Sequence, residues 1–433
     1  MSEVTVGILG ILALFILFFT GLEMAFAMAI VGLLGFCVLG SVEGAMSMVA
    51  KDLFETFSSY GLIVIPLFVF MGQVAFNAGI AKRMYDGAHR FVGHIPGGLA
   101  LATVVGVTVF KTICGSAAAT NATFAAVAVP EMNRFNYSPR LSTGIVAVAG
   151  TLGVLLPPSV ILIIFGMITE ISVGKLFLAG IFPGLALAAL FAAVVIGWCK
   201  RSPEVGPKST RFSWKERISY LPQVAWALLI FVLMIGGLMA GIFTPTEAGS
   251  VGALSVIILT FCQREMDFAT LLKSIIESLR TGSMVLMLIA ASTILGHFLA
   301  ITNIPMITAD WVVSLPIHRH VVMILIFFIF LIGGSIIDDL AFLILATPIF
   351  YPAMMKLGYD PLWVGIMISL TVVVGGVLPP VAMNVFVVQN VTKVPVGVIY
   401  KGVYPFLISM VLLIALMFVF PQIALFLPHA LMK

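Results

Sequence analysis

Long apolar stretches alternate with short polar segments from one end of the chain to the other. Uninterrupted runs such as 4–22, 178–198 and 403–420 are each long enough to cross a bilayer as a helix. In lipid only helices and closed barrels satisfy their own backbone polar groups, and runs of this length are typical of helices. The pattern therefore predicts an all-α polytopic membrane protein.

Two of the apolar segments are interrupted in the same way. Residues 137–183 read YSP…GVLLPP…IFP, and residues 359–405 read YDP…GGVLPP…VYP. The differences 359 − 137, 361 − 139, 379 − 157 and 405 − 183 all give 222, so the two copies align without a gap. A duplicated apolar segment interrupted by Pro-Pro is typical of transporters whose broken helices form a binding site at mid-membrane. We predict broken helices at 139–169 and 361–391.

Two other apolar stretches are divided into arms too short for an ordinary span. The first, 97–131, is interrupted by KTICGS at 111–116, and the second, 319–356, by GGSIIDD at 333–339. Each predicts a re-entrant helical hairpin, the first entering from the cytoplasm and the second from outside. The two halves then form inverted-topology repeats. The matching glycines 115 and 334 are only 219 residues apart, which predicts small insertions between the hairpins and the aligned core.

Composition and charge exclude several other classes of protein. With 61% hydrophobic and 9% charged residues, the chain cannot be a soluble globular domain. Its basic residues cluster in three loops near 82–90, 200–217 and 264–280, which the positive-inside bias places in the cytoplasm. The net charge of +4 therefore indicates no nucleic-acid partner, and the membrane lipid is the surrounding medium. The four cysteines have no paired spacing, so neither a disulfide framework nor a metal cluster is indicated.

These patterns predict the division of the chain into five parts. They are N-terminal scaffold spans with an interfacial segment (1–60), a first repeat (61–199), a cytoplasmic linker (200–221), further scaffold spans with an interfacial segment (222–282), and a second repeat (283–433).

The Pro-Pro pairs also predict a cation site. Proline has no N–H, so each proline in a helix leaves the carbonyl four residues earlier without a donor. The carbonyls predicted to be free are those of Gly153, Val154, Gly375 and Gly376. Unpaired carbonyls are costly in hydrocarbon unless protein, water or a cation satisfies them, and a cluster of carbonyl oxygens suits Na⁺. A plain proline kink is the alternative. The recurrence at matching positions, each beside a Gly-rich hairpin turn, favours the ion site.

The hairpin turns predict a complementary anion site. Each turn begins a half-helix whose free N–H groups and positive dipole end suit an anionic group, near Ser116 and near 339–340. The alternative is that the small residues there only permit close helix packing. Asp339 fits a helix N-cap, which leaves Asp338 to contact substrate or ion. The predicted substrate-binding residues are Lys111, Ser116, Thr120, Asn121, Asp338 and Asn384.

Lys111 has two competing functional interpretations. An ionisable residue inside a membrane segment is a candidate functional group. Lys111 could be the counter-charge for an anionic substrate, or a built-in cation that replaces a bound metal ion. Snorkelling towards water is the structural alternative, although the hairpin tip makes that path long. For Glu247, in TPTEAGS, we expect helix capping or a packing contact.

Taken together, these segments resemble the large membrane subunit of a tripartite ATP-independent periplasmic (TRAP) transporter. The resembling segments are IPLFVFMG (65–72), GSAAAT and VPEMNRFNY (115–137), GTLGVLLPPS (150–159), FTPTEAG (243–249), GSIIDD with TPIFYP (334–352), and LPPVAMNVF (378–386).

The resemblance implies secondary active import of a small organic anion, such as a dicarboxylate, sugar acid or sulfonate. Import would cross a bacterial or archaeal inner membrane, be driven by a cation gradient (Na⁺ usually, H⁺ possible), and use an elevator movement of the transport domain. The implied partners are a small membrane subunit and a periplasmic substrate-binding protein, with no enzymatic activity and no other cofactor. We expect the small subunit to be a separate chain, because this one begins directly with a membrane span.

The resemblance also implies two Na⁺ sites. Mapped onto this sequence, they involve Cys114, Gly153, Leu156, Pro157, Gly334, Gly375, Leu378 and Val381. The first turn is often serine-rich in the family, whereas Lys111 and Cys114 stand here, and Leu378 replaces a threonine that often precedes the second Pro-Pro. Both changes remove a hydroxyl ligand. Our hypothesis is that at least one Na⁺ site is altered and that Lys111 supplies positive charge instead.

Rival functions differ in what they require. A stand-alone ion-coupled symporter or antiporter of a related inverted-repeat fold could share these features without needing a binding protein. A channel is disfavoured, because no pore-lining ring of charge is evident. An intramembrane enzyme is disfavoured because adjacent residues on a helix, such as Asp338 and Asp339, diverge by about 100°.

Overall fold

A computed structural model describes residues 2–431, and every regular element within them is a helix. Within that range, nine helical stretches are long and apolar enough to cross a membrane. The prediction of an all-α polytopic membrane protein is therefore confirmed. Many large apolar side chains on the outer helices are exposed, for example Val232 on α12 and Ile408 on α20, as expected of surfaces that face lipid.

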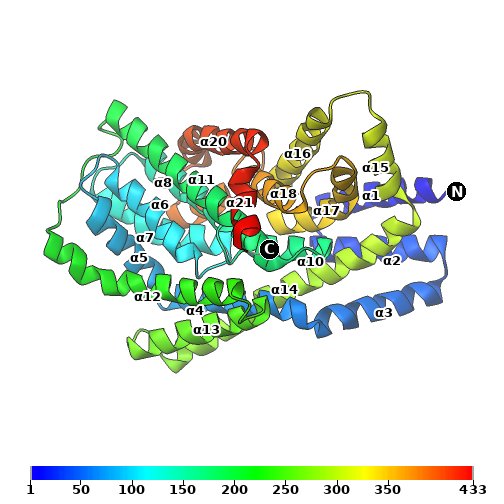
Figure 1. Cartoon of the computed structure of the whole chain (residues 1–433), viewed down its shortest axis with the longest axis horizontal. Coiled ribbons are helices and arrows are strands. Elements are labelled where there is room, and N and C mark those ends of the chain that lie inside the picture. The colour runs from blue at the N-terminus through cyan, green and yellow to red at the C-terminus, as the bar shows by residue number, and fades with distance from the viewer. Residues whose placement is uncertain (1, 432–433) are drawn as a thin grey trace.

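Among the N-terminal and mid-chain helices, α3, α4, α12, α13 and α14 run along the lower side of the molecule in Figure 1, and the others lie above them. Their bounds are α1 Glu3–Phe19, α2 Met24–Leu39, α3 Val42–Ser58, a 3-10 turn Tyr60–Ile63, α4 Val64–Asn77, α5 Ile80–Val92, α12 Trp214–Met239, α13 Pro245–Cys262, α14 Phe268–Ile301 and α15 Ile304–Ser314. The 34-residue helix α14 packs against α2, α3 and α4. Asp52 of α3 is buried and accepts a hydrogen bond from Nδ1 of His297 on α14 at 2.9 Å. Glu247 caps α13 together with Thr244, as predicted.

Two sets of helices form the repeated part of the chain. The first set is α6 Gly98–Lys111, α7 Ala117–Arg134, α8 Pro139–Ala149, α9 Leu152–Leu155, α10 Val160–Thr169 and α11 Val173–Arg201. The second set is α16 Arg319–Ile336, α17 Asp339–Lys356, α18 Pro361–Gly375, α19 Met383–Thr392 and α20 Val396–Val419, followed by α21 Gln422–Leu431. The hairpins α6–α7 and α16–α17 lie towards opposite ends of the long axis (Figure 1).

The duplication seen in the sequence recurs in the helix boundaries. Helix α7 spans 117–134 and α17 spans 339–356, so both of their ends are offset by 222 residues, as are the starts of α8 at 139 and α18 at 361. The predicted insertions between the hairpins and the core are therefore wrong. The difference lies in the turns, which are residues 112–116 in one hairpin and only 337–338 in the other. Gly115 lies in a turn, whereas Gly334 lies inside α16.

Both predicted helix breaks are present. Helix α8 ends at Ala149, a single turn α9 follows, and α10 begins at Val160 after the Pro-Pro pair. In the second half α18 ends at Gly375 and α19 begins at Met383. Every residue of α18 from Leu362 to Gly375 is buried, which explains why this helix is apolar on all faces.

The three basic loops meet at one end of the molecule. Arg83 of α5 pairs with Glu265 in the loop between α13 and α14. The guanidinium of Arg90 lies 4.2 Å from the ring centroid of Tyr220 on α12. Because contacts join these loops, they lie on the same side of the molecule, as the positive-inside argument requires.

Glycine permits the closest helix crossing in the core. Helices α8 and α20 cross where Gly144 faces Gly402, and a Cβ on Gly402 would overlap the backbone carbonyl of Arg140.

We predict that Gly402→Val lowers the free energy of unfolding by about 1–3 kcal/mol, because an overpacked contact forces the two helices apart. Gly397→Val on the same helix is the matched control, since open space surrounds Gly397. Equal unfolding midpoints for the two variants would refute this packing.

Candidate functional site

Each hairpin tip meets the break of its own half. In the first half, a Cβ on Gly115 would lie 3.5 Å from the carbonyl oxygen of Pro158. In the second half, the N–H groups of Val381 and Ala382 donate to the carbonyl of Ser335 at 3.2 and 3.4 Å. The backbone of α16 at Gly334 lies directly against Gly375. Hairpins and breaks therefore form one continuous region in the interior.

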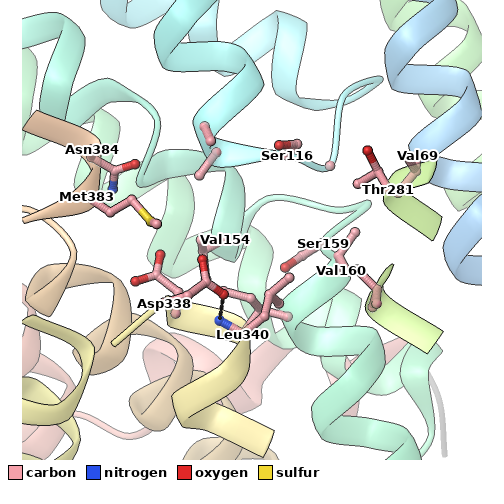
Figure 2. Close-up of a pocket in the computed structure, with 16 residues that line it drawn as sticks. Val69, Ser116, Val154, Ser159, Val160, Thr281, Asp338, Leu340, Met383 and Asn384 are labelled. Atoms are coloured by element: carbon pink, nitrogen blue, oxygen red, sulfur yellow. Dashed lines mark hydrogen bonds between the residues drawn. The ribbon is translucent and has the colours of Figure 1, made fainter. Parts of the chain in front are cut away.

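A cavity of about 120 Å³ lies where the two halves meet. Figure 2 shows Ser116, Ser159, Asp338 and Asn384 around the same space. The lining residues are Val69, Gly115, Ser116, Ala117, Ala118, Val154, Ser159, Val160, Ile161, Thr281, Val285, Asp338, Asp339, Leu340, Met383 and Asn384. The first residues of four helices, α7, α10, α17 and α19, are among them. Helices α4 and α14 contribute Val69, Thr281 and Val285.

Backbone donors concentrate on the first-half side of this cavity. Ser116 caps α7 by accepting from the N–H of Ala119 at 3.3 Å, and Ser159 caps α10 by accepting from Leu162 at 3.3 Å. The backbone N–H groups of the first two residues of each helix have no acceptor among the described residues. They belong to Ala117 and Ala118 in α7 and to Val160 and Ile161 in α10. Two half-helix N-termini therefore present unpaired donors, which makes this side of the cavity suited to an anion.

The second-half side of the cavity is acidic. Asp338 is the N-cap of α17 and accepts from the N–H groups of Leu340 and Ala341 at 3.1 and 3.3 Å (Figure 2). The predicted assignment of the cap to Asp339 is therefore wrong, and the roles of the two residues are exchanged. Asp339 is half-buried, and its buried Oδ1 has no partner within residues 2–431. Since Ser116 and Asp338 are 222 residues apart, the same N-cap position carries a neutral group in one half and a charged group in the other.

Two asparagines join the halves behind the cavity. Nδ2 of Asn121 on α7 donates to Oδ1 of Asn384 on α19 at 2.9 Å and lies 3.4 Å from the carbonyl of Ala147. Gly150 leaves room for Asn121, because a Cβ there would overlap its amide. Asn384 also lines the cavity, whereas Asn121 does not. The amide pair is therefore a direct polar link between a hairpin of one repeat and the broken helix of the other.

Two other predicted substrate contacts lie away from the cavity. The hydroxyl of Thr120 donates to the carbonyl of Ser116 at 2.8 Å and lies 3.8 Å from Sγ of Cys114, so its bonding stays within the hairpin. Lys111 is completely buried at the end of α6, where its side chain lies against Gly153. Neither residue is in the cavity lining.

The predicted free carbonyls behave differently in the two halves. In the second half the prediction is wrong, because the carbonyl of Gly375 accepts from Leu378 at 2.8 Å and that of Gly376 accepts from Asn384 at 3.1 Å. A turn that ends at Leu378, before the Pro-Pro pair, supplies the first donor, and the chain folds back after Pro380 to supply the second from Asn384. In the first half, no hydrogen bond to the carbonyls of Gly153 or Val154 is found in the part of the chain that the structure describes.

The residues predicted as Na⁺ ligands form two groups, one at each helix break. Gly334, Gly375, Leu378 and Val381 gather around the second break, close to the acidic side of the cavity. Gly153, Leu156 and Pro157 lie at the first break, and Cys114 lies in the first turn. Leu156 contributes only its backbone there, since its side chain packs against Gly184.

Several lining residues were missed by sequence reasoning, among them Ser159, Met383 and Thr281. Ser159 directly follows Pro157-Pro158, and a serine after a helix break is a recognisable N-cap signal that could have identified it. Met383 begins α19, next to the predicted Asn384. Thr281 comes from α14, and no local pattern marks it, because only the tertiary arrangement brings that helix to the cavity.

Fold and site together define a multi-pass membrane protein with an interior cavity between repeated halves, lined by apolar side chains and a few polar ones. Residues 11–423 match the family described as "Tripartite ATP-independent periplasmic transporter, DctM component", so the chain belongs to that family. It is 35% identical to the C4-dicarboxylate TRAP transporter large permease protein DctM of Pseudomonas aeruginosa over 90% of this chain and 91% of that protein. It is 31% identical to the 2,3-diketo-L-gulonate TRAP transporter large permease protein YiaN of Escherichia coli, over 87% of this chain and 89% of that protein.

Two further comparisons extend this picture. The isethionate TRAP transporter permease protein DctMQ of Oleidesulfovibrio alaskensis is 31% identical over 91% of this chain, which covers 62% of that protein. The crystal structure of the Alcanivorax borkumensis YdaH transporter superposes with a TM-score of 0.63 over 90% of this chain and 89% of that one, at 11% identity. This second likeness supports the fold alone.

The asparagine bridge makes a measurable prediction. Because each amide is buried and bonded to the other, Asn121→Ala and Asn384→Ala should each destabilise the protein, and the double variant should lose less than the sum. We expect a coupling energy of about 0.5–1.5 kcal/mol. Reversible unfolding of the four proteins in detergent measures it, and strictly additive losses would exclude the bridge.

Proposed function

We propose that this chain is the membrane permease of a secondary active importer for a small organic anion. The importer acts in a bacterial or archaeal inner membrane and is coupled to a cation gradient, most simply Na⁺. The main supporting observation is the opposite character of the two sides of the cavity. Unpaired N–H groups of α7 and α10 face it from the first half, and the carboxylates of Asp338 and Asp339 face it from the second.

This polarity assigns positions to the two transported species. A substrate carboxylate binds the unpaired N–H groups at the starts of α7 and α10, with the hydroxyls of Ser116 and Ser159 beside it. The coupling cation binds on the Asp339 side, where the carboxylate lies close to the crowded backbone at Gly375 and Gly376. Each charge lowers the cost of burying the other, so anion and cation bind together more readily than either binds alone.

The second break fits a hard cation on chemical grounds. A buried carboxylate oxygen without a partner among residues 2–431 lies 2.8 Å from the position of a Cβ on Gly376. Oxygen ligands of this kind, carboxylate and carbonyl, are those that Na⁺ takes, and H⁺ could satisfy the same carboxylate. A cation bound there would neutralise Asp339 and complete the site on that side.

Cavity size favours a small substrate. About 120 Å³ is well below the ~300–1,000 Å³ of pockets for drug-sized ligands. The substrates in the names of three relatives are C4-dicarboxylate, 2,3-diketo-L-gulonate and sialic acid. Of these, a C4-dicarboxylate is the smallest, and the isethionate named for the DctMQ relative is smaller still. We propose a dicarboxylate of about that size, because a C4-dicarboxylate is named for the 35% identical relative.

The scaffold contacts of the cavity support alternating access by an elevator movement. Most lining residues come from the two repeats, and Val69, Thr281 and Val285 come from α4 and α14. A displacement of the repeats past these two helices would carry the site across the membrane with its own lining intact, and the hairpins would act as re-entrant gates.

Two partners complete the proposal, a small membrane subunit and a periplasmic substrate-binding protein. The family description names a tripartite transporter, and this chain leaves more than a third of the DctMQ relative unmatched, which leaves room for another component. The rival function is a stand-alone symporter or antiporter that takes free substrate.

Reconstituted uptake tests the proposal and its rival together. The chain and the small membrane protein encoded beside it are placed in proteoliposomes with an inward Na⁺ gradient. Labelled C4-dicarboxylate is then supplied with or without the neighbouring binding protein. We expect uptake only when the gradient, both membrane chains and the binding protein are present. Uptake of free substrate by this chain alone would establish the rival, and no uptake of any small organic anion would refute the proposal.

A pair of substitutions distinguishes an effect on the binding site from an effect on folding. Ser159→Ala removes the cap hydroxyl at the start of α10 in the cavity, and Ser172→Ala makes the same change at the N-cap of α11, outside the lining. We expect uptake to fall at least tenfold for the first variant and at most about twofold for the second, at equal protein levels. Equal losses would mean that the cavity at the start of α10 does not hold the substrate.

A further inference from the structure

Lys111 is the most unusual side chain in the interior. It is completely buried, and its Nζ has no hydrogen-bond partner among the residues that the structure covers. The side chain lies across Gly153, where an added Cβ would overlap its Cδ, Cε and Nζ. Gly153 is therefore a glycine because the lysine occupies the space that its side chain would fill. The lysine and the first helix break fit each other as one unit.

The position of the ammonium explains how it can be tolerated. An isolated charge in a dry interior is strongly unfavourable unless oxygen atoms surround it. Pro157 and Pro158 have no N–H, so they leave the carbonyls of Gly153 and Val154 without their helical donors. Nζ lies beside Gly153, at the turn that carries both carbonyls.

The second half has no counterpart of this cation. Helix α6 ends at Lys111, whereas the matching helix α16 ends at Ile336 and carries no lysine or arginine after Arg319 at its start. The second half instead contributes the carboxylate of Asp339, beside Gly376. The two repeats thus carry opposite fixed charges at their breaks, and the Asn121–Asn384 bridge lies between them.

We propose that the ammonium of Lys111 is a resident cation that takes the place of a bound Na⁺ at the first break. The first half of the molecule then binds no exchangeable cation, and coupling is confined to the Asp339 side. The residues at the first break do not fit a metal ion while Lys111 fills the space at Gly153, and Cys114 offers a thiol in place of a hydroxyl. This inference rests on the proposed function, because a coupling ion is defined only for an ion-driven importer.

The proposal also decides between the two interpretations of Lys111. As a direct counter-charge it would have to reach the substrate, but Lys111 does not line the cavity. As a resident cation it acts from beside Gly153, next to the lining residue Val154, and its field favours an anion in the cavity. A fixed charge does this in every conformation, whether or not Na⁺ is bound.

Equilibrium binding of ²²Na⁺ to the purified full chain in nanodiscs tests this directly, because it needs neither substrate nor transport. The variants are Lys111→Ser, which opens the space and adds a hydroxyl, and Lys111→Arg, which keeps the charge. Lys401→Ser on the exposed face of α20 is the matched control. We expect at most one Na⁺ per wild-type chain, one more for Lys111→Ser, and no change for Lys111→Arg or Lys401→Ser.

Each outcome has a definite meaning. Two Na⁺ per wild-type chain, or no gain in Lys111→Ser, would overturn the proposal. If Lys111→Ser does not fold, the wild-type stoichiometry together with Asp339→Asn still decides. We expect Asp339→Asn to remove any remaining Na⁺ binding, and an Na⁺ that persists in it would place the ion at the first break and overturn the proposal. Import driven by two Na⁺ would refute the resident cation and leave the proposed function intact. If the expected Na⁺ binding is found but no import occurs, the resident cation stands and the proposed function is refuted.

Discussion

The whole arrangement depends on proline lacking an N–H in the middle of a membrane helix. Each Pro-Pro pair ends one helix in the interior and lets another begin a few residues later. Backbone groups that an unbroken helix would satisfy internally are thereby placed in a region without bulk water. Hairpin tips, asparagine amides, a lysine and two carboxylates gather there, and their contacts are best understood as responses to that one constraint.

The two halves solve the same backbone problem in different ways. At the second break the chain folds back, and the N–H groups of Leu378 and Asn384 bond to the glycine carbonyls. At the first break no such donor is recorded within residues 2–431, and the side chain of Lys111 lies there instead. The N-caps of the hairpins differ similarly, Ser116 in one half and Asp338 in the other. The repeated fold is thus symmetric in its helices and asymmetric in its charge.

Local sequence patterns were enough to predict the helix breaks, the hairpins and the capping role of Glu247. The Pro-Pro pairs, the constant offset and the TPTE capping signal each act over a few residues, so no tertiary information was needed. The failures arose where two local solutions were equally good or where distant segments meet. Adjacent aspartates both suit an N-cap, and only the backbone path shows that Asp338 takes it. Thr281 and the fit of Lys111 to Gly153 depend on packing between remote helices, which no local pattern encodes.

The central claim is that one cavity between the broken helices holds the anion at the starts of α7 and α10. A cryo-electron microscopy map of the full chain with a bound C4-dicarboxylate tests this most directly. The account predicts ligand density within hydrogen-bond distance of the N–H groups of Ala117 and Val160, with Asp339 on the opposite side. Ligand density outside the cavity, with these N–H groups facing only protein, would contradict it.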